Sequence, residues 1–254
     1  MPSRPLGCLT GRGMNFFVAR SPLRDLHDKV AAGERLSEAD ALHLFACRDL
    51  PALRALADFA NQRRNGLRAT YILNRYINYS NYCILSCQFC AFARKKRDAD
   101  GFELSVDQIV ARAREAMSRG ITELHIVGGL HPSLPFEYYL EMLRALRAVG
   151  PHLHLKCFTA IEILHLAWLA RRSVRDTLVA LRDAGLDSLT GGGAEIFAPA
   201  VRVQIARGKE SAEEWLDVHR TWHRLGGRST CTMLYGHVES AADRVDHLRR
   251  LRAL

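Results

Sequence analysis

Apolar positions along the chain follow two different patterns, and the change between them falls at Tyr71. Over residues 22–70, apolar side chains recur at the spacing of an amphipathic helix. Ser37 followed by Asp40 is a helix-start signal, and Pro51 suits the first turn of a further helix. The pattern therefore predicts a helical N-terminal segment that precedes a differently built second part.

From Tyr71 onward, short β-rich runs alternate with amphipathic runs of helix length. Ser105 and Gln108 form a capping-box pattern before the first helical run, and glycines follow most of these runs, as at many helix C-termini. The alternation indicates parallel βαβ units, which make an α/β open or partial barrel over residues 71–254. Catalytic residues of such barrels collect at the carboxyl ends of the strands. We expect strands over residues 75–80, 122–127, 153–158, 186–190 and 229–234, and helices over residues 105–119, 136–149, 174–184, 211–225 and 240–253.

The start of the chain resembles neither a signal peptide nor a membrane anchor. Its apolar run, Phe16 to Ala19, is four residues long, which is far shorter than a signal-peptide core. No stretch of the sequence approaches the roughly 20 apolar residues that cross a bilayer. We therefore expect a disordered leader over residues 1–21 and a cytoplasmic protein without a membrane span.

Composition and charge narrow the possible partners. The 254 residues are 48% hydrophobic and 25% charged, which is typical of a globular protein that builds its own core. The net charge of +9 raises the question of nucleic-acid binding. However, most basic residues are arginines scattered through the predicted helices, and the basic run at residues 94–97 has no interleaved aromatic side chains. We therefore expect no nucleic-acid partner.

Three of the seven cysteines are bunched, because Cys83, Cys87 and Cys90 lie within eight residues directly after the first predicted strand. Such bunching indicates metal binding rather than the disulfide framework of a secreted protein. Thiolates are soft ligands suited to iron–sulfur clusters or to zinc. Three ligands leave one iron of a [4Fe–4S] cluster open, and an open iron can chelate S-adenosylmethionine (SAM). A structural zinc site of three cysteines and one histidine is the alternative, although no histidine lies nearby in the sequence.

Glycines and polar side chains gather after the later strands as well. Gly128 and Gly129 end the second strand, where a glycine pair lets the backbone approach a ligand. Glu195 follows three glycines after the fourth strand and could bond the ribose of SAM or lie beside the substrate. Lys156 and His237 are candidates for pairing with a substrate carboxylate and for proton transfer, respectively. For each of these residues, a purely structural role is the alternative.

The spacing C-x3-C-x2-C, with Phe89 before the last cysteine, resembles that of the radical SAM superfamily. In that superfamily the aromatic position lies near the adenine of SAM, and a glycine pair after the second strand contacts the amino group. The resemblance therefore implies that Phe89, Gly128 and Gly129 bind SAM, together with Glu195.

Longer segments resemble one family within that superfamily, the aminofutalosine synthases of the futalosine route to menaquinone. The matching segments are residues 78–81, 90–92, 123–132, 158–163, 191–197 and 232–237. The resemblance implies a transferase that adds the 5′-deoxyadenosyl radical to 3-[(1-carboxyvinyl)oxy]benzoate, forming aminodeoxyfutalosine and consuming SAM. It also implies a reducing electron donor such as flavodoxin or ferredoxin.

Alternatives to that reaction stay open. The sister cyclic dehypoxanthine futalosine cyclases share the segments that flank the cysteines, but they resemble this chain less around Gly128 and Glu195. Members of the aminofutalosine synthase family also extend beyond the helix that ends at Leu254. We therefore expect a barrel that lacks the last strand and the C-terminal segment, with impaired catalysis. A truncated inactive protein and a zinc-binding module are the remaining alternatives.

Overall fold

The computed structural model describes residues 15–254, and the chain divides between Thr70 and Tyr71 into two compact units. A disordered leader was predicted over residues 1–21, and residues 1–14 of it lie outside the described residues. The rest of that prediction is wrong, because Phe16–Ala19 form a short helix, α1, in which Val18 is fully buried. Val18 therefore packs into the core of the first unit, whereas Phe16 and Phe17 are largely exposed.

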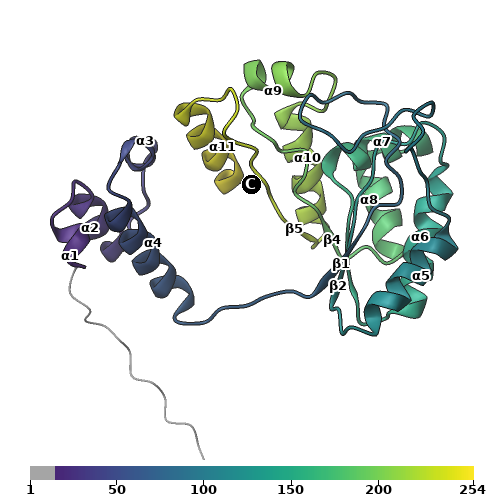
Figure 1. Cartoon of the computed structure of the whole chain (residues 1–254), viewed down its shortest axis with the longest axis horizontal. Coiled ribbons are helices and arrows are strands. Elements are labelled where there is room, and N and C mark those ends of the chain that lie inside the picture. The colour runs from purple at the N-terminus through teal and green to yellow at the C-terminus, as the bar shows by residue number, and fades with distance from the viewer. Residues whose placement is uncertain (1–14) are drawn as a thin grey trace, which may run out of the picture. The chain divides into compact units, whose positions relative to one another are not determined.

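Helices build the first unit, as predicted (Figure 1). After α1 they are α2 (Arg24–Ala32), α3 (Glu38–Ala46) and α4 (Leu50–Asn65). The helix-start signal is confirmed, because the Asp40 N–H donates to the Ser37 hydroxyl at 3.1 Å and the Asp40 carboxylate accepts from the Ser37 N–H at 2.8 Å. Pro51 lies in the first turn of α4. Apolar side chains from α1, α2 and α4 form the small core of this unit.

A five-stranded parallel sheet organises the second unit, with the strands in chain order (Figure 1). The strands are β1 (Asn74–Ile77), β2 (Glu123–Ile126), β3 (His154–Cys157), β4 (Ser188–Leu189) and β5 (Arg228–Ser229). Since β1 and β5 are the edges and do not pair with each other, the sheet is an open partial barrel. This confirms the predicted architecture, although all five strands are shorter than the sequence indicates, the last two most of all.

Helices follow the strands in the βαβ manner expected. They are α5 (Val106–Met117), α6 (Phe136–Val149), α7 (Ala160–Ala170), α8 (Val174–Asp183), α9 (Pro199–Ile205), α10 (Ala212–Arg224) and α11 (Ala241–Ala253). The predicted capping box before α5 is present, with the Gln108 N–H donating to the Ser105 hydroxyl at 3.2 Å. Two of these helices, α7 and α9, were not predicted. Within residues 15–254, no helix has both the length and the apolar character that crossing a bilayer requires.

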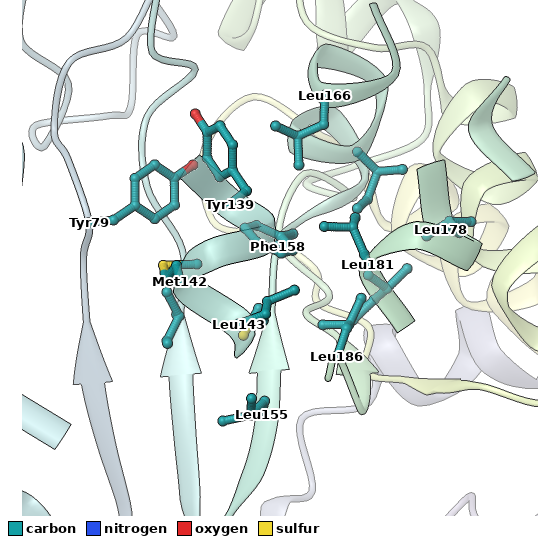
Figure 2. Close-up of a cluster of buried hydrophobic side chains, with 14 of the residues drawn as sticks. Tyr79, Tyr139, Met142, Leu143, Leu155, Phe158, Leu166, Leu178, Leu181 and Leu186 are labelled. Atoms are coloured by element: carbon teal, nitrogen blue, oxygen red, sulfur yellow. The ribbon is translucent and has the colours of Figure 1, made fainter. Parts of the chain in front are cut away.

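Alternation of side chains along the strands separates a hydrophobic core from a polar sheet face. On one face, Leu124 and Leu155 are fully buried and pack with apolar side chains of α5 to α8 and α10 (Figure 2). On the other face, the register places Tyr76, His125 and Lys156 side by side on β1, β2 and β3. The helices therefore cover one side of the sheet, and polar side chains occupy the other.

Candidate active site

Loops after the strands converge on one cavity of about 220 Å³ at the carboxyl end of the sheet. Most of the site residues predicted from the sequence line it, namely Cys83, Cys87, Phe89, Cys90, Gly128, Gly129 and Glu195. They come from the loops after β1, β2 and β4, which are far apart in the sequence. The cavity therefore lies where barrel folds of this kind carry their chemistry.

Backbone contacts fasten the loop that carries the cysteines. The Cys83 N–H donates to the Arg94 carbonyl at 2.9 Å. The Lys95 ammonium lies among carbonyl oxygens of the same loop and donates to Cys83 and Leu85, each at 2.8 Å. A loop whose backbone groups are paired in this way directs its side chains consistently. The basic run at residues 94–97 thus has a local role beside the cysteines.

All three cysteines of this loop are free thiols and partly exposed. Burial raises the pKa of the Cys87 thiol, and the nearby Lys209 ammonium opposes that shift. The Leu130 N–H lies 3.4 Å from the Cys83 sulfur, a contact of the kind that adjusts the potential of iron–sulfur sites. Within residues 15–254, no three His, Cys, Asp or Glu side chains lie close enough together to bind a single metal ion. Three separate thiols that face one cavity fit a [4Fe–4S] cluster, in which each iron takes one thiolate.

Gly128 and Gly129 lie where neighbouring groups come too close for a side chain. A Cβ atom at Gly128 would be 2.4 Å from the Tyr79 ring, and one at Gly129 would be 2.2 Å from the Tyr82 carbonyl oxygen. The pair is therefore packed closely against the loop after β1, whereas its contact with a bound ligand stays a prediction. Because the Gly128 N–H is already bonded to Glu162, at 3.1 Å, a bound ligand would meet this residue through its carbonyl edge.

Glu162, in the first turn of the unpredicted helix α7, is a buried carboxylate beside this cavity. It accepts hydrogen bonds from the Tyr79 hydroxyl at 2.7 Å, from the Gly128 N–H at 3.1 Å, and from both the N–H and the hydroxyl of Thr159 at 2.7 Å. Burial raises its pKa, whereas these donors lower it. Since the donors follow β1, β2 and β3, Glu162 ties three strand ends together. The Thr-x-x-Glu capping-box signal could have located it from the sequence.

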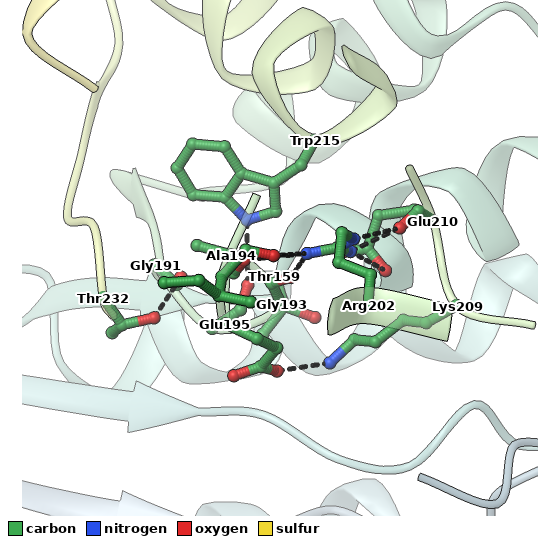
Figure 3. Close-up of polar contacts among 12 residues, drawn as sticks. Thr159, Gly191, Gly193, Ala194, Glu195, Arg202, Lys209, Glu210, Trp215 and Thr232 are labelled. Atoms are coloured by element: carbon green, nitrogen blue, oxygen red, sulfur yellow. Dashed lines mark hydrogen bonds and ion pairs between the residues drawn. The ribbon is translucent and has the colours of Figure 1, made fainter. Parts of the chain in front are cut away.

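Glu195 and Lys209 form an ion pair in the wall of the cavity, with 2.6 Å between the Lys209 Nζ and a Glu195 oxygen (Figure 3). Their side chains are 12% and 10% exposed, so solvent screens the pair weakly. The ammonium also lies 5.5 Å from the centroid of the Phe89 ring, within cation–π range. Burial lowers the pKa of Lys209, but the Glu195 and Glu210 carboxylates raise it overall. Sequence reasoning did not select Lys209, because only the folded chain brings it to Glu195.

The other two catalytic candidates do not line the cavity. The Lys156 ammonium pairs with the Glu123 carboxylate at 2.7 Å on the polar face of the sheet. The His237 ring lies in a turn after β5, where its Nδ1 is 3.1 Å from a Glu239 oxygen. The catalytic roles of Lys156 and His237 therefore stay predictions, and among the three candidates the geometry favours Glu195.

Glu210 is a buried carboxyl group beside the glycine-rich loop at residues 191–195, and it directly follows Lys209 in the sequence. Among the described residues, its two oxygens have no hydrogen-bond partner, and the Arg202 Nη2 lies 3.8 Å away. One oxygen lies against Gly193, where a Cβ atom would be only 2.4 Å from it. Burial raises the pKa of Glu210 to about 8, against the opposing effect of the Lys209 and Arg202 cations.

Replacing Glu210 with glutamine will reduce the loss of stability that the protein shows as the pH rises. Because the pKa of Glu210 is raised in the folded state, the folded protein holds this proton more tightly than the unfolded chain does. The free energy of unfolding therefore falls between about pH 4.5 and about pH 8, by on the order of a few kcal/mol. Urea unfolding at about pH 5 and about pH 8 measures this difference. Glu141→Gln, on the exposed side of α6, is the matched control and should keep the wild-type pH dependence. An equal pH dependence in Glu210→Gln would contradict the prediction.

Comparison with known sequences identifies the class of protein. The profile of the radical SAM superfamily matches residues 77–251, which include the three cysteines and the loops after all five strands. The chain belongs to the radical SAM superfamily. Membership implies a [4Fe–4S] cluster and SAM, and the spacing of Cys83, Cys87 and Cys90 agrees with both.

Curated relatives include two aminodeoxyfutalosine synthases. The one from Thermus thermophilus is 44% identical over 227 residues, which are 89% of this chain and 61% of that protein. The one from Streptomyces coelicolor is 44% identical over 231 residues, 91% of this chain and 60% of that protein. A 5-amino-6-(D-ribitylamino)uracil–L-tyrosine 4-hydroxyphenyl transferase from Methanopyrus kandleri is 39% identical over 241 residues, 91% of this chain and 65% of that protein. The chain thus spans about 60% of the length of the two synthases.

Solved structures agree on the fold. Methylornithine synthase (PylB) matches with a TM-score of 0.71 at 19% identity, over 90% of this chain and 64% of that one. The hydrogenase maturase HydG from Carboxydothermus hydrogenoformans matches with a TM-score of 0.70 at 18% identity, over 91% and 52%. At this identity the likeness shows the shared fold, which is the partial barrel predicted from the sequence.

Proposed function

We propose that the chain is a radical SAM transferase of the aminofutalosine synthase type. It would add the 5′-deoxyadenosyl radical to 3-[(1-carboxyvinyl)oxy]benzoate to form aminodeoxyfutalosine in menaquinone biosynthesis. The observation that carries this proposal is the 44% identity to two aminodeoxyfutalosine synthases over about nine tenths of the chain. Because the chain spans about 60% of those relatives, the activity of the whole enzyme belongs to the proposal.

Within this proposal the cysteine loop would hold the cluster, with Cys83, Cys87 and Cys90 each binding one iron. The reduced cluster would supply the electron that cleaves SAM, after delivery by a donor such as flavodoxin or ferredoxin. The protein's own part is to hold these groups in fixed positions and to limit the access of water. Paired backbone groups around Cys83 and the buried contacts of Glu162 support such a rigid site.

SAM would lie in the same cavity, in contact with Phe89, Gly128, Gly129 and Glu195. We add Lys209 to this set, since its ammonium faces the cavity beside Glu195 and the Phe89 ring. A buried ion pair offers one cationic and one anionic group, and SAM carries both a carboxylate and ribose hydroxyls. The pair therefore matches both kinds of polar group on SAM.

A second candidate function rests on the relative from Methanopyrus kandleri. That hydroxyphenyl transferase is 39% identical to the chain over 241 residues, close to the identity of the synthases. The shared cysteine loop and SAM cavity would serve either reaction, so the substrate distinguishes the two.

Two measurements test the proposal in sequence. The chain is reconstituted anaerobically with iron and sulfide, reduced, and examined by EPR with and without SAM. A [4Fe–4S]⁺ signal that changes when SAM is added supports the cofactor assignment, whereas zinc without a cluster signal would overturn it. Product analysis with the enol ether, with dehypoxanthine futalosine, or with ribitylaminouracil and tyrosine then separates the synthase from the cyclase and the transferase.

A further inference from the structure

The guanidinium of Arg202, on α9, is buried behind the glycine-rich loop and is 6% exposed (Figure 3). Its Nη1 donates to the carbonyl of Ala194 at 2.7 Å and to that of Ile196 at 3.3 Å. Its Nε donates to the carbonyl of Glu210 at 3.2 Å. The guanidinium therefore forms its hydrogen bonds with backbone carbonyls, whereas the Glu210 carboxylate lies 3.8 Å away.

These contacts fix the backbone of Glu195. One nitrogen of Arg202 binds the carbonyls on both sides of Glu195, and Glu195 itself has φ of 43°. Residues other than glycine rarely adopt this left-handed conformation, so surrounding contacts have to impose it. In Figure 3 the Ala194 carbonyl points to Arg202, while the Glu195 carboxylate points to Lys209. The turn therefore directs the Glu195 side chain toward Lys209 and the cavity.

The same guanidinium also holds the other half of the ion pair. The carbonyl that accepts from its Nε belongs to Glu210, the residue directly after Lys209. Arg202 Nη2 contacts this carbonyl as well. Both chain segments that carry the ion pair, at Glu195 and at Lys209, are therefore joined to each other through one buried side chain.

We propose that Arg202 is the positioning residue of the SAM site, which sets the distance and direction of Glu195 and Lys209 without touching the ligand. This inference rests on the proposed function, because SAM is the ligand concerned. Lysine cannot replace arginine here, since a single ammonium cannot bind carbonyls on two sides with the fixed fork of a guanidinium. Arg202→Lys should therefore leave the cysteines intact and disturb the Glu195–Lys209 pair.

Arg147 provides a matched control at the opposite end of the strands. Its guanidinium also binds backbone carbonyls, those of Leu153 and Gly185, each at 2.8 Å. These carbonyls precede β3 and β4, far along the strands from the cavity. Arg147→Lys should thus lower stability by the loss of similar contacts but leave SAM binding unchanged.

The test measures the affinity of the reconstituted 254-residue chain for SAM. The change in the EPR signal of the reduced cluster on addition of SAM reports the binding. We expect about tenfold weaker binding in Arg202→Lys, with wild-type iron content, and wild-type affinity in Arg147→Lys. Wild-type affinity in Arg202→Lys, or an equal loss in both variants, would overturn the inference. If Arg202→Lys does not fold, Arg202→Gln, which keeps an amide donor near Ala194, replaces it in the comparison.

A double-mutant cycle separates positioning from a general loss of structure. If Arg202 acts through the ion pair, Arg202→Lys should weaken SAM binding little further in a Glu195→Gln background. Fully additive losses would show that Arg202 acts elsewhere and would overturn the inference. A wild-type chain with a cluster that never responds to SAM would instead remove the proposed function, and this inference with it.

Discussion

Replacement of Cys87 by alanine will leave the chain unable to retain an iron–sulfur cluster. Within residues 15–254, three cysteines line the cavity, and two thiolates cannot hold a cluster that already has one open iron. The thiol of Cys87 also packs against the small apolar cluster around Ile196 and Ile205, which tolerates an alanine methyl. We therefore expect a folded protein whose iron and acid-labile sulfide fall to background after anaerobic reconstitution, together with its visible absorbance.

Cys231→Ala is the control for that experiment. Cys231 is exposed and does not line the cavity, so its variant should take up iron and sulfide like the wild type. Equal cluster content in Cys87→Ala and wild type would show that the cluster has other ligands. Zinc in stoichiometric amount, lost together with Cys87, would favour the zinc-binding module instead.

Much of this site could be predicted because its signals are local in the sequence. Cys83, Cys87 and Cys90 lie within eight residues of one another in the loop after β1, and the glycines directly follow β2 and β4. Parallel βαβ units bring such ends to one edge of a sheet. Local motifs were therefore enough to predict the cysteines, the glycine pair and Glu195 in the lining of the cavity, but not Lys209.

Helix α7 was missed for a physical reason. Apart from Glu162 and His165, its residues are apolar or aromatic, so periodicity finds no polar stripe. Six of its eleven residues are buried, as in a helix covered on several sides. The apolar run could equally belong to a strand. Only its capping box distinguishes a helix there.

Strand β5 is shorter than predicted because its continuation contacts the glycine-rich loop. The Thr232 hydroxyl donates to the Gly191 carbonyl at 2.7 Å, and the Leu234 N–H donates to the Glu195 carbonyl at 2.8 Å. These contacts replace ladder hydrogen bonds with support for the candidate SAM site. They join segments about 40 residues apart, and nothing local in the sequence indicates them.

The ion-pair partners of charged side chains could not be predicted from the sequence either. Lys156 has the charge suited to a substrate carboxylate, but Glu123 on the neighbouring strand satisfies it at 2.7 Å. Lys209 has the same charge but lies in the loop after α9, where it lines the cavity and pairs with Glu195 at 2.6 Å. Charge type is therefore visible in the sequence, whereas the partner of each charge depends on the folded arrangement of strands and loops.

Substitution of Gly129 by alanine will disturb both folding and cluster uptake. The new Cβ atom would lie 2.2 Å from the Tyr82 carbonyl oxygen and 2.9 Å from the Cβ of Cys83. The backbone cannot easily yield, because the Gly129 N–H donates to the Ser80 carbonyl at 3.0 Å. Overpacking of this kind costs about 1–3 kcal/mol. Denaturant unfolding of the cluster-free protein should show that loss, and reconstitution should show reduced iron content.

Gly192→Ala is the contrast that links the effect to the cysteine loop. Gly192 also lines the cavity, but a Cβ atom there would lie 2.9 Å from a methyl group of Thr159 and would not meet the backbone of another segment, as a Cβ atom at Gly129 does. We expect Gly192→Ala to lose clearly less stability than Gly129→Ala and to retain its iron. If both variants were equally stable, the loops after β1 and β2 would have room to separate. The glycine at position 129 would then be explained by contact with a ligand rather than by the packing of Tyr82 and Cys83 against it.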